Sequence, residues 1–539
     1  MPANLVLLNA NVVTMDPLRP RAQAVAVGGG RILGVGSNAD VLGWANGNAV
    51  VRDLGGRTLV PGFYDSHNHM LMTGLSLIAV DLSAARSVDD VLRAIEQRAV
   101  SVSPGAWVVS SARWHESQLV EQRFPLRAEL DRASAGQPVL LQRGGHNVVA
   151  NSQALEAAGI ESNVPNPPGG TFVRDADGTL TGHAIGAAAQ ALRARMPDPP
   201  EQVLHEVLVR IQRAYNTAGI TSVIDPGLAP PQIAAYQSLA RGGQATVRAS
   251  LMWRLHPGFD DRSLQSALDQ LRSGSVRADL DHPWARVVSI KLGVDGGVEA
   301  GYYRDAYAFA DDPASPRGKP AMSQANLEAF CIDAARLGWT VGAHCVGDAA
   351  IDATLTAFEA ADRAASIATR RWTLIHMMLA REDHWARANK LKLVVTAQQP
   401  LMYSLAQGFL KYIGPERTRD MEPLRMYLDR SEQPVGGGSD SPVAPFEPLL
   451  GMWSSVTRQT HGAGVQGEQW KITPEQALRM YTLGSAYAAF EEQHKGSITP
   501  GKLADLVVLD ADPCGVEPEA VRDIRVLHTM VSGEVVFDA

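Results

Sequence analysis

The chain has 539 residues, of which 45% are hydrophobic and 20% charged, and its formal net charge is −8. This composition is ordinary for a globular protein with one large and one smaller domain, and the negative charge argues against nucleic-acid and anionic-membrane partners. The cysteines Cys331, Cys345 and Cys514 have no close spacing, which excludes a disulfide framework and a thiolate metal site and favours the cytoplasm. The N-terminus does not resemble a signal peptide, and no run of about 18 apolar residues predicts a membrane helix.

Both ends of the chain contain short apolar runs broken by glycine. Within the first 57 residues they lie at 5–8, 24–27 and 32–35, and near the C-terminus at 504–510, 526–531 and 535–537. Runs of this kind predict β-strands. We therefore expect residues 1–57 and 488–539 to combine into one small β-sandwich domain.

The middle of the chain alternates predicted strands with predicted helices. Buried strands are expected at 220–225, 287–292, 340–344, 372–376 and 393–397, and helices at 203–218, 324–337 and 349–364. Repeated βα units predict an α/β fold over residues 58–487, built on a parallel sheet or a (β/α)8 TIM barrel, and we expect the barrel. Residues 70–215 are too long for one connection, so we interpret them as an insertion that covers the site.

Two histidines one residue apart, His67 and His69, follow an apolar run that reads as a buried strand. Because side chains alternate along a strand, both imidazoles are expected on one face, where they could bind one metal ion. The alternative is a pair of histidines in a surface turn.

Four further polar residues stand at the C-terminal ends of predicted strands or in the glycine-rich run 436–443. They are Lys291, His344, His376 and Asp440. Taken singly, each has an ordinary interpretation as a solvated lysine, a hydrogen-bonded core histidine or a turn. Six such residues at strand ends predict a site for zinc or a similar divalent ion, because catalytic groups of a βα barrel gather there.

With these residues in view, the chain resembles the amidohydrolase superfamily, and within it the amidohydrolase-3 branch of YtcJ-like and N-substituted formamide deformylase-like hydrolases. The resemblance covers nearly the whole length. It rests on the segments 61–69, 143–146 with 151–152, 347–350, 399–400 and 495–506.

The resemblance implies a binuclear metal centre with a carboxylated lysine. Two zinc ions per chain, or other divalent metals, would be bound, one by His67 and His69 and the other by His344 and His376. Lys291 would react with CO2 to form a bridging carbamate, and Asp440 would contribute a carboxylate. Asp440 would also contact the bridging hydroxide and move its proton to the leaving nitrogen.

Three positions depart from the family pattern. Ile375, Gly144 and Gly186 stand where relatives usually carry acidic residues. None of the three is an expected metal ligand, so the departures imply a pocket that differs from those of relatives.

Pocket residues are predicted more loosely. His146 could donate to a substrate carbonyl or oxyanion, or it could be a structural loop histidine. Substrate contacts are predicted for a set of apolar and aromatic residues near strand ends, for which core packing is the alternative: Trp114, His115, Met377, Met378 and Tyr403.

These features predict a metal-dependent hydrolase of a non-peptide C–N bond in an amide, formamide or carbamate with an apolar or aromatic substituent. The alternatives are hydrolysis of a lactam, ester or aryl carbamate, and a non-catalytic binding or regulatory protein on a hydrolase fold. The partner expected is a small amide-type molecule, and a homodimer is compatible with the resemblance.

Overall fold

A computed structural model describes residues 2–112, 114–144, 147–310 and 314–539. Its centre is an eight-stranded parallel sheet in which each strand pairs with the next in chain order. The strands are β8 (Phe63–Asp65), β14 (Ile220–Leu228), β15 (Arg248–Arg254), β16 (Ala285–Gly293), β17 (Val341–Cys345), β18 (Thr373–His376), β19 (Val394–Ala397) and β20 (Gly436–Gly437). A hydrogen bond of 2.9 Å from Ser66 N to Gly437 O joins the first strand to the last, so the sheet is nearly closed. The predicted barrel is confirmed.

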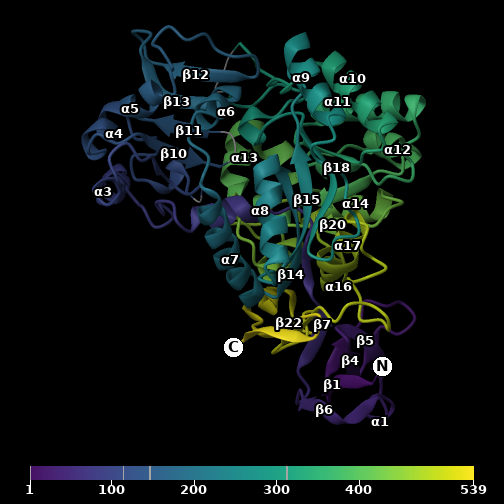
Figure 1. Cartoon of the computed structure of the whole chain (residues 1–539). Coiled ribbons are helices and arrows are strands. Elements are labelled where there is room, and N and C mark those ends of the chain that lie inside the picture. The colour runs from purple at the N-terminus through teal and green to yellow at the C-terminus, as the bar shows by residue number, and fades with distance from the viewer. Residues whose placement is uncertain (1, 113, 145–146, 311–313) are drawn as a thin grey trace.

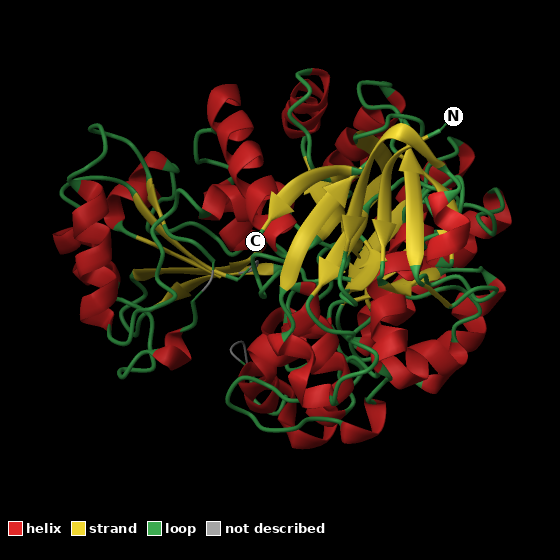
Figure 2. Cartoon of the chain, turned by 90° about the horizontal axis from the view of Figure 1, so that it is seen from below, coloured by secondary structure: helices red, strands yellow, loops and turns green. Residues whose placement is uncertain are grey.

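Helices surround this barrel, and the view from below in Figure 2 shows helices on several sides of the strands. They are α7 (Glu201–Thr217), α8 (Pro230–Arg241), α9 (Asp261–Arg272), α10 (Gln324–Arg336), α11 (Asp348–Ala364), α12 (Glu382–Lys390), α13 (Gln399–Arg419), α14 (Leu424–Arg430), α15 (Pro448–Thr457), α16 (Pro474–Arg479) and α17 (Ser485–Ala488). The outer faces of the strands and the inner faces of these helices share one large hydrophobic core. No helix among the described residues is long and apolar enough to cross a bilayer.

The two ends of the chain share a sheet, as expected. Antiparallel pairing of Val60 with Val507 joins the segment before the barrel to the segment after it. The six-stranded sheet contains β2 (Asn11–Val13), β3 (Arg21–Ala22), β7 (Thr58–Pro61), β21 (Leu506–Leu509), β22 (Val526–Val531) and β23 (Glu534–Asp538). A second sheet of β1 (Ala3–Leu8), β4 (Ala24–Gly28), β5 (Arg31–Gly36) and β6 (Ala45–Asp53) lies beside it with α1 (Asn38–Leu42), at the foot of the molecule in Figure 1.

The run before His67, expected to be one strand, is two strands in different sheets. β7 belongs to the terminal sheet and β8 to the barrel, and Gly62 separates them. A Cβ atom at Gly62 would lie 2.3 Å from Thr221 Oγ1, so the close approach of β14 requires glycine there.

After the short helix α2 (Met70–Ser76), the segment before α7 forms a separate lobe with its own sheet and cores. Figure 1 shows this lobe beside the upper part of the barrel. Its strands are β9 (Val108–Val109), β10 (Val139–Arg143), β11 (Asn147–Ala150), β12 (Gly170–Arg174) and β13 (Leu180–Gly186), and its helices are α3 (Val88–Ala99), α4 (Arg127–Ala133), α5 (Ser152–Ala157) and α6 (Ala187–Arg193).

Below the mouth, the barrel interior is filled by side chains. Ile224, Met252, Val288 and Ile375 are all buried and surround a cavity of only about 20 Å³. Such a volume holds about one water molecule. A substrate can therefore reach the barrel only from the C-terminal ends of the strands, where the polar candidates lie.

Candidate metal centre

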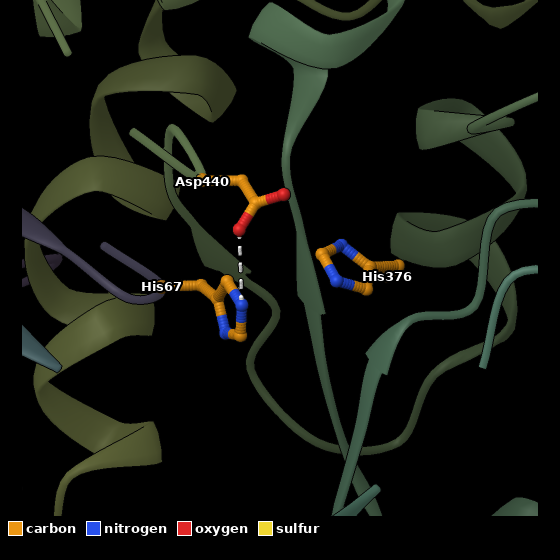
Figure 3. Close-up of side chains that lie close together, drawn as sticks. All are labelled: His67, His376 and Asp440. Atoms are coloured by element: carbon orange, nitrogen blue, oxygen red, sulfur yellow. Dashed lines mark ion pairs between the residues drawn. The ribbon is translucent and has the colours of Figure 1, made fainter. Parts of the chain in front are cut away.

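Three candidate ligands meet at the barrel mouth. One ligand atom from each of His67, His376 and Asp440 lies within 4.8 Å of the others, and all three side chains point toward one another in Figure 3. Asp440 Oδ1 is 3.2 Å from His67 Nε2 and 3.2 Å from His69 Nε2. Imidazole nitrogens and a carboxylate at this spacing are suited to a divalent transition metal.

Lys291 and His344 join the same cluster. Lys291 Nζ lies 3.4 Å from His67 Nε2, and the rings of His344 and His376 are 4.5 Å apart between centroids. Neighbouring strands bring the two residues together, since Gly293 at the end of β16 pairs with His344 in β17. The structure therefore brings all six predicted ligands together.

The backbone departs from regular strand geometry at two of the ligands. Ile375 faces the interior cavity, so a regular strand would turn the next side chain away from the barrel axis. His376 instead has a φ of 67°, and its ring lies 4.8 Å from that of His67. Asp440 has a φ of 60°. Left-handed backbone at non-glycine residues is strained and gathers at functional sites.

His67 and His69 do not share a strand, contrary to the sequence interpretation. β8 ends at Asp65, and His69 stands at the start of α2. Their backbones are instead held by hydrogen bonds from His67 N to Asp65 Oδ1, 3.1 Å, and from His69 N to Ser441 O, 2.9 Å. The shared direction of the two rings toward Asp440 is thus a property of the turn.

Burial sets the protonation states of the cluster. It lowers the pKa of His67 to about 3, with the positive charge of Lys291 as the next cause, and it lowers the pKa of His376 well below the usual range. Burial alone would raise the pKa of Asp440, but hydrogen bonds from His67 and His69 hold it well below its ordinary value. At neutral pH His67 and His376 are neutral imidazoles and Asp440 is a carboxylate, which are the forms that bind metals.

Lys291 brings a buried amine into the site. Its side chain is 8% exposed, and burial lowers the pKa of its amine to about 7. Among the described residues no carboxylate lies within ion-pair distance of it. A large fraction of this lysine is therefore an uncharged amine at neutral pH, which is the form that reacts with CO2.

Carboxylates behind the cluster hold its backbone and rings. Asp65 accepts hydrogen bonds from Asn68 Nδ2 at 2.8 Å and from Ser439 N at 3.0 Å. Asp295 accepts from the backbone nitrogens of Val346 and Gly347, and its Oδ1 lies 3.7 Å from His344 Nε2. Outer groups of this kind orient metal-binding histidines. The sequence analysis assigned no role to either aspartate, although each stands within four residues of a predicted ligand.

Three of the residues predicted to contact substrate pack in hydrophobic cores. Trp114 packs in a core of the separate lobe, and its Nε1 donates to Gln142 O. Met377 lies in the core between barrel and helices, and Met378 in a neighbouring core. His146 lies outside the described residues. The substrate contacts of this set stay predictions.

Tyr403 and His115 occupy two other environments. Tyr403 packs against Trp453 and lines a groove of about 460 Å³ between α7, α15 and the C-terminal segment, which none of the six ligands lines. His115 is half-buried, and its Nδ1 accepts from Ser117 N. The pKa of His115 is lowered first by burial and then by Arg143.

A buried ion network joins the separate lobe to the barrel loop after β16. Arg143 donates to Glu116 at 2.9 Å and to Glu299 at 3.1 Å, and Asn147 Nδ2 donates to Glu299 at 2.9 Å. Glu299 follows Lys291 by eight residues. The network therefore fixes the lobe against a loop of the candidate site.

Comparison with known proteins identifies close similarity along the whole chain. The model of the amidohydrolase family matches residues 50–537. The chain is 30% identical over 562 residues to N-substituted formamide deformylase from Arthrobacter pascens, covering 99% of this chain and 98% of that protein. It is 28% identical to putative amidohydrolase YtcJ from Bacillus subtilis, with 98% of each chain covered. An uncharacterized metal-dependent hydrolase from Pyrococcus horikoshii has the same fold, with a TM-score of 0.75, 22% identity, and 95% and 99% of the two chains covered.

Proposed function

The chain belongs to the amidohydrolase family, and from that premise we propose that it hydrolyses a non-peptide C–N bond in an amide, formamide or carbamate with an apolar or aromatic substituent. The observation that carries the proposal is the meeting of His67, His376 and Asp440 at the barrel mouth, with Lys291 beside them. The name of the formamide deformylase relative supports the substrate class.

The residues present fit a pair of divalent ions, for which zinc is our candidate. His67 and His69 would hold one ion, and His344 and His376 the other. The buried nitrogens His67 Nδ1 and His376 Nδ1 have no hydrogen-bond partner among the described residues, and both rings are kept neutral by burial. When bound, such ions lower the pKa of a water so that hydroxide forms near pH 7, and they polarise a carbonyl.

Lys291 is proposed to carry a carbamate. Its uncharged Nζ would form a bond to the carbon of CO2 and lose a proton, which leaves an anionic group with two oxygens able to bridge the ions. A lysine ammonium could not bind a cation, because it has no free lone pair. The lowered pKa of Lys291 supports this modification, as does the lack of an ion pair to it within the described part of the chain.

Asp440 is proposed to move the proton. Its carboxylate is ionised at neutral pH and would accept a proton from the attacking water. It would then give that proton to the leaving nitrogen, so that an amine and not an amide anion departs. The apolar interior beneath the ligands limits the water available there, which strengthens the charge interactions of the site.

Turnover of matched amides and esters tests this proposal. A formamide, an acetamide and an ester that share one arylalkyl group would be compared with wild-type protein and Asp440→Asn, at equal metal content. We expect hydrolysis of at least one amide, and a fall of about 10³-fold or more in Asp440→Asn. Hydrolysis of the ester alone would contradict the C–N assignment, and no turnover of any compound would favour a binding protein.

A further inference from the structure

An arginine stands at the mouth of the barrel, facing the barrel axis. Along β15, side chains alternate between the barrel interior and the surrounding helices. Ser250 lies 3.0 Å from Tyr64 Oη inside the barrel, and Met252 lines the small interior cavity. Arg254 is the next member of this inward row, at the C-terminal end of the strand. Unlike the other residues of β15 it is exposed, so its guanidinium lies where the barrel opens.

Arg254 is a close neighbour of Lys291. The two residues are partners in the register of β15 and β16, and Leu255 N donates to Lys291 O at 3.3 Å. Burial is the main cause of the lowered pKa of Lys291, the charges of Asp440 and Cys345 oppose it, and the positive charge of Arg254 adds a smaller lowering effect. A group bound by Arg254 would therefore lie one strand away from the candidate metal ligands.

One further arginine lies close to Arg254 and keeps its charge at neutral pH. Burial, followed by the positive charge of Arg254, lowers the pKa of this Arg193 to about 10. Among the described residues the guanidinium of Arg254 makes no hydrogen bond or ion pair. The pKa of His256 is likewise lowered by burial and then by Arg254. Arg143 offers a contrast in the same part of the molecule, since Glu116 and Glu299 neutralise it.

We propose that Arg254 binds a carboxylate carried on the N-substituent of the substrate. The inference rests on the proposed function and narrows it to N-acyl or N-formyl amino acids and related acids. The guanidinium presents a planar fork of donors that matches the two oxygens of a carboxylate. A positive mouth beside the reacting centre also attracts an anionic substrate from solution.

The experiment compares two substrates that differ in one charge, N-formylphenylalanine and its C-terminal primary amide. Values of kcat/KM are measured for wild type, Arg254→Met and Arg254→Lys, with metal content determined for each preparation. We expect wild type to prefer the acid, and Arg254→Met to lower kcat/KM for the acid by about 10-fold to 100-fold. The amide should change by less than about threefold, and Arg254→Lys should be intermediate because it keeps the charge without the fork.

Arg241→Met is the matched control, because Arg241 is also exposed and stands in the last turn of α8, outside the barrel. It removes the same charge far from the barrel mouth. The ratio of kcat/KM for the acid to kcat/KM for the amide should therefore stay unchanged. An equal loss in Arg241→Met and Arg254→Met, or a ratio that Arg254→Met does not alter, would overturn the proposal.

A binding measurement separates this proposal from the proposed function. Calorimetric titration of metal-loaded protein with 3-phenylpropionate and 3-phenylpropanamide reports carboxylate recognition without turnover. One outcome is that wild type binds the acid more tightly, that Arg254→Met abolishes this preference, and that neither formyl compound is hydrolysed. This outcome would support the carboxylate site and argue against the proposed function. Turnover of both formyl compounds with no role for Arg254 in either measurement would do the reverse.

Discussion

Two buried lysines of the barrel differ in their surroundings, since one has an acidic partner and the other lies beside neutral bases. Lys495 lies at the N-terminal end of the barrel, where its Nζ is 3.1 Å from Glu491 and 3.0 Å from Ser222 Oγ. Lys291 lies at the mouth, where its Nζ is 3.4 Å from His67 Nε2, itself a base kept neutral by burial. Both lysines have pKa values lowered by burial, to about 8 and about 7.

The difference extends to the groups around each lysine. At the floor of the barrel, Glu491 also accepts from Tyr64 Oη at 2.8 Å and pairs with Arg286, so every charge has a partner. At the mouth, His376 and Asp440 adopt left-handed backbone, and Arg254 has no partner among the described residues. Satisfied networks stabilise a fold, whereas strained or unpartnered groups gather where a ligand completes them.

The largest expected effect comes from removing the unpaired lysine. Lys291→Ala should lose at least one bound metal ion and lower kcat by about 10³-fold or more, since metals supply several kcal/mol of catalysis. With metal removed from both proteins, the variant should unfold at nearly the same temperature as wild type, because the unmodified Lys291 has no ion-pair partner among the described residues. Metal analysis, turnover and thermal unfolding of the same preparation check this. A stable, metal-replete and active variant would contradict it.

At the N-terminal end of the barrel we expect a loss of stability without a loss of activity. Glu491→Leu leaves Lys495 and Arg286 buried without their acid and should lower the free energy of unfolding by about 3–5 kcal/mol. The folded fraction should keep its kcat within about threefold, because Glu491 lies away from the mouth. Denaturant unfolding and active-site-normalised turnover measure the two quantities. A variant of wild-type stability with impaired kcat would reverse the assignment of the two regions.

A smaller effect is expected for a residue that acts through a ligand. Asp295→Asn keeps the shape of the side chain that accepts from Val346 and Gly347 and approaches His344. We expect metal affinity to fall by about 10-fold to 100-fold. Competition with a chelator measures the affinity, and saturating metal should restore turnover. Failure to recover at high metal would assign Asp295 another role.

The smallest expected effect is on how the stability of the protein depends on pH under acidic conditions. Burial alone would raise the pKa of Glu491, but Lys495 and Arg286 hold it below its ordinary value. A carboxyl with a depressed folded-state pKa contributes stability above its unfolded value, about 4.3, and loses it as pH falls through the folded value. Unfolding between about pH 5 and 3 should therefore depend less steeply on pH in Glu491→Gln than in wild type. Glu382→Gln, in an exposed pair with Arg430 that also lowers the pKa of Glu382, is the matched control and should change the slope less, because solvent screens an exposed pair.

The sequence was informative where a strand or helix has a regular apolar pattern. It predicted the barrel, the sheet shared by both ends, and six polar residues that the structure brings together. It did not reveal β15, because a strand that reads Arg-Ala-Ser-Leu-Met-Trp-Arg has charged residues at both ends. Those arginines have tertiary roles, since Arg248 pairs with Asp505 and Arg254 lies at the mouth.

Other features depend on contacts that no local pattern encodes. β20 is only Gly436–Gly437, and its place in the barrel comes from pairing with β19. The left-handed backbone at His376 overrides strand alternation, which would otherwise turn its ring away from the barrel axis. The predicted substrate residues Trp114 and Met377 have large apolar side chains, and the structure buries both in hydrophobic cores.

Metal content per chain tests the central claim most directly. Protein purified without added metal would be analysed before and after incubation with zinc and bicarbonate, alongside Lys291→Ala. The account predicts about two divalent ions per wild-type chain and fewer in the variant. A wild-type value near zero that zinc and bicarbonate do not raise, or equal values in both proteins, would contradict a lysine-bridged metal centre.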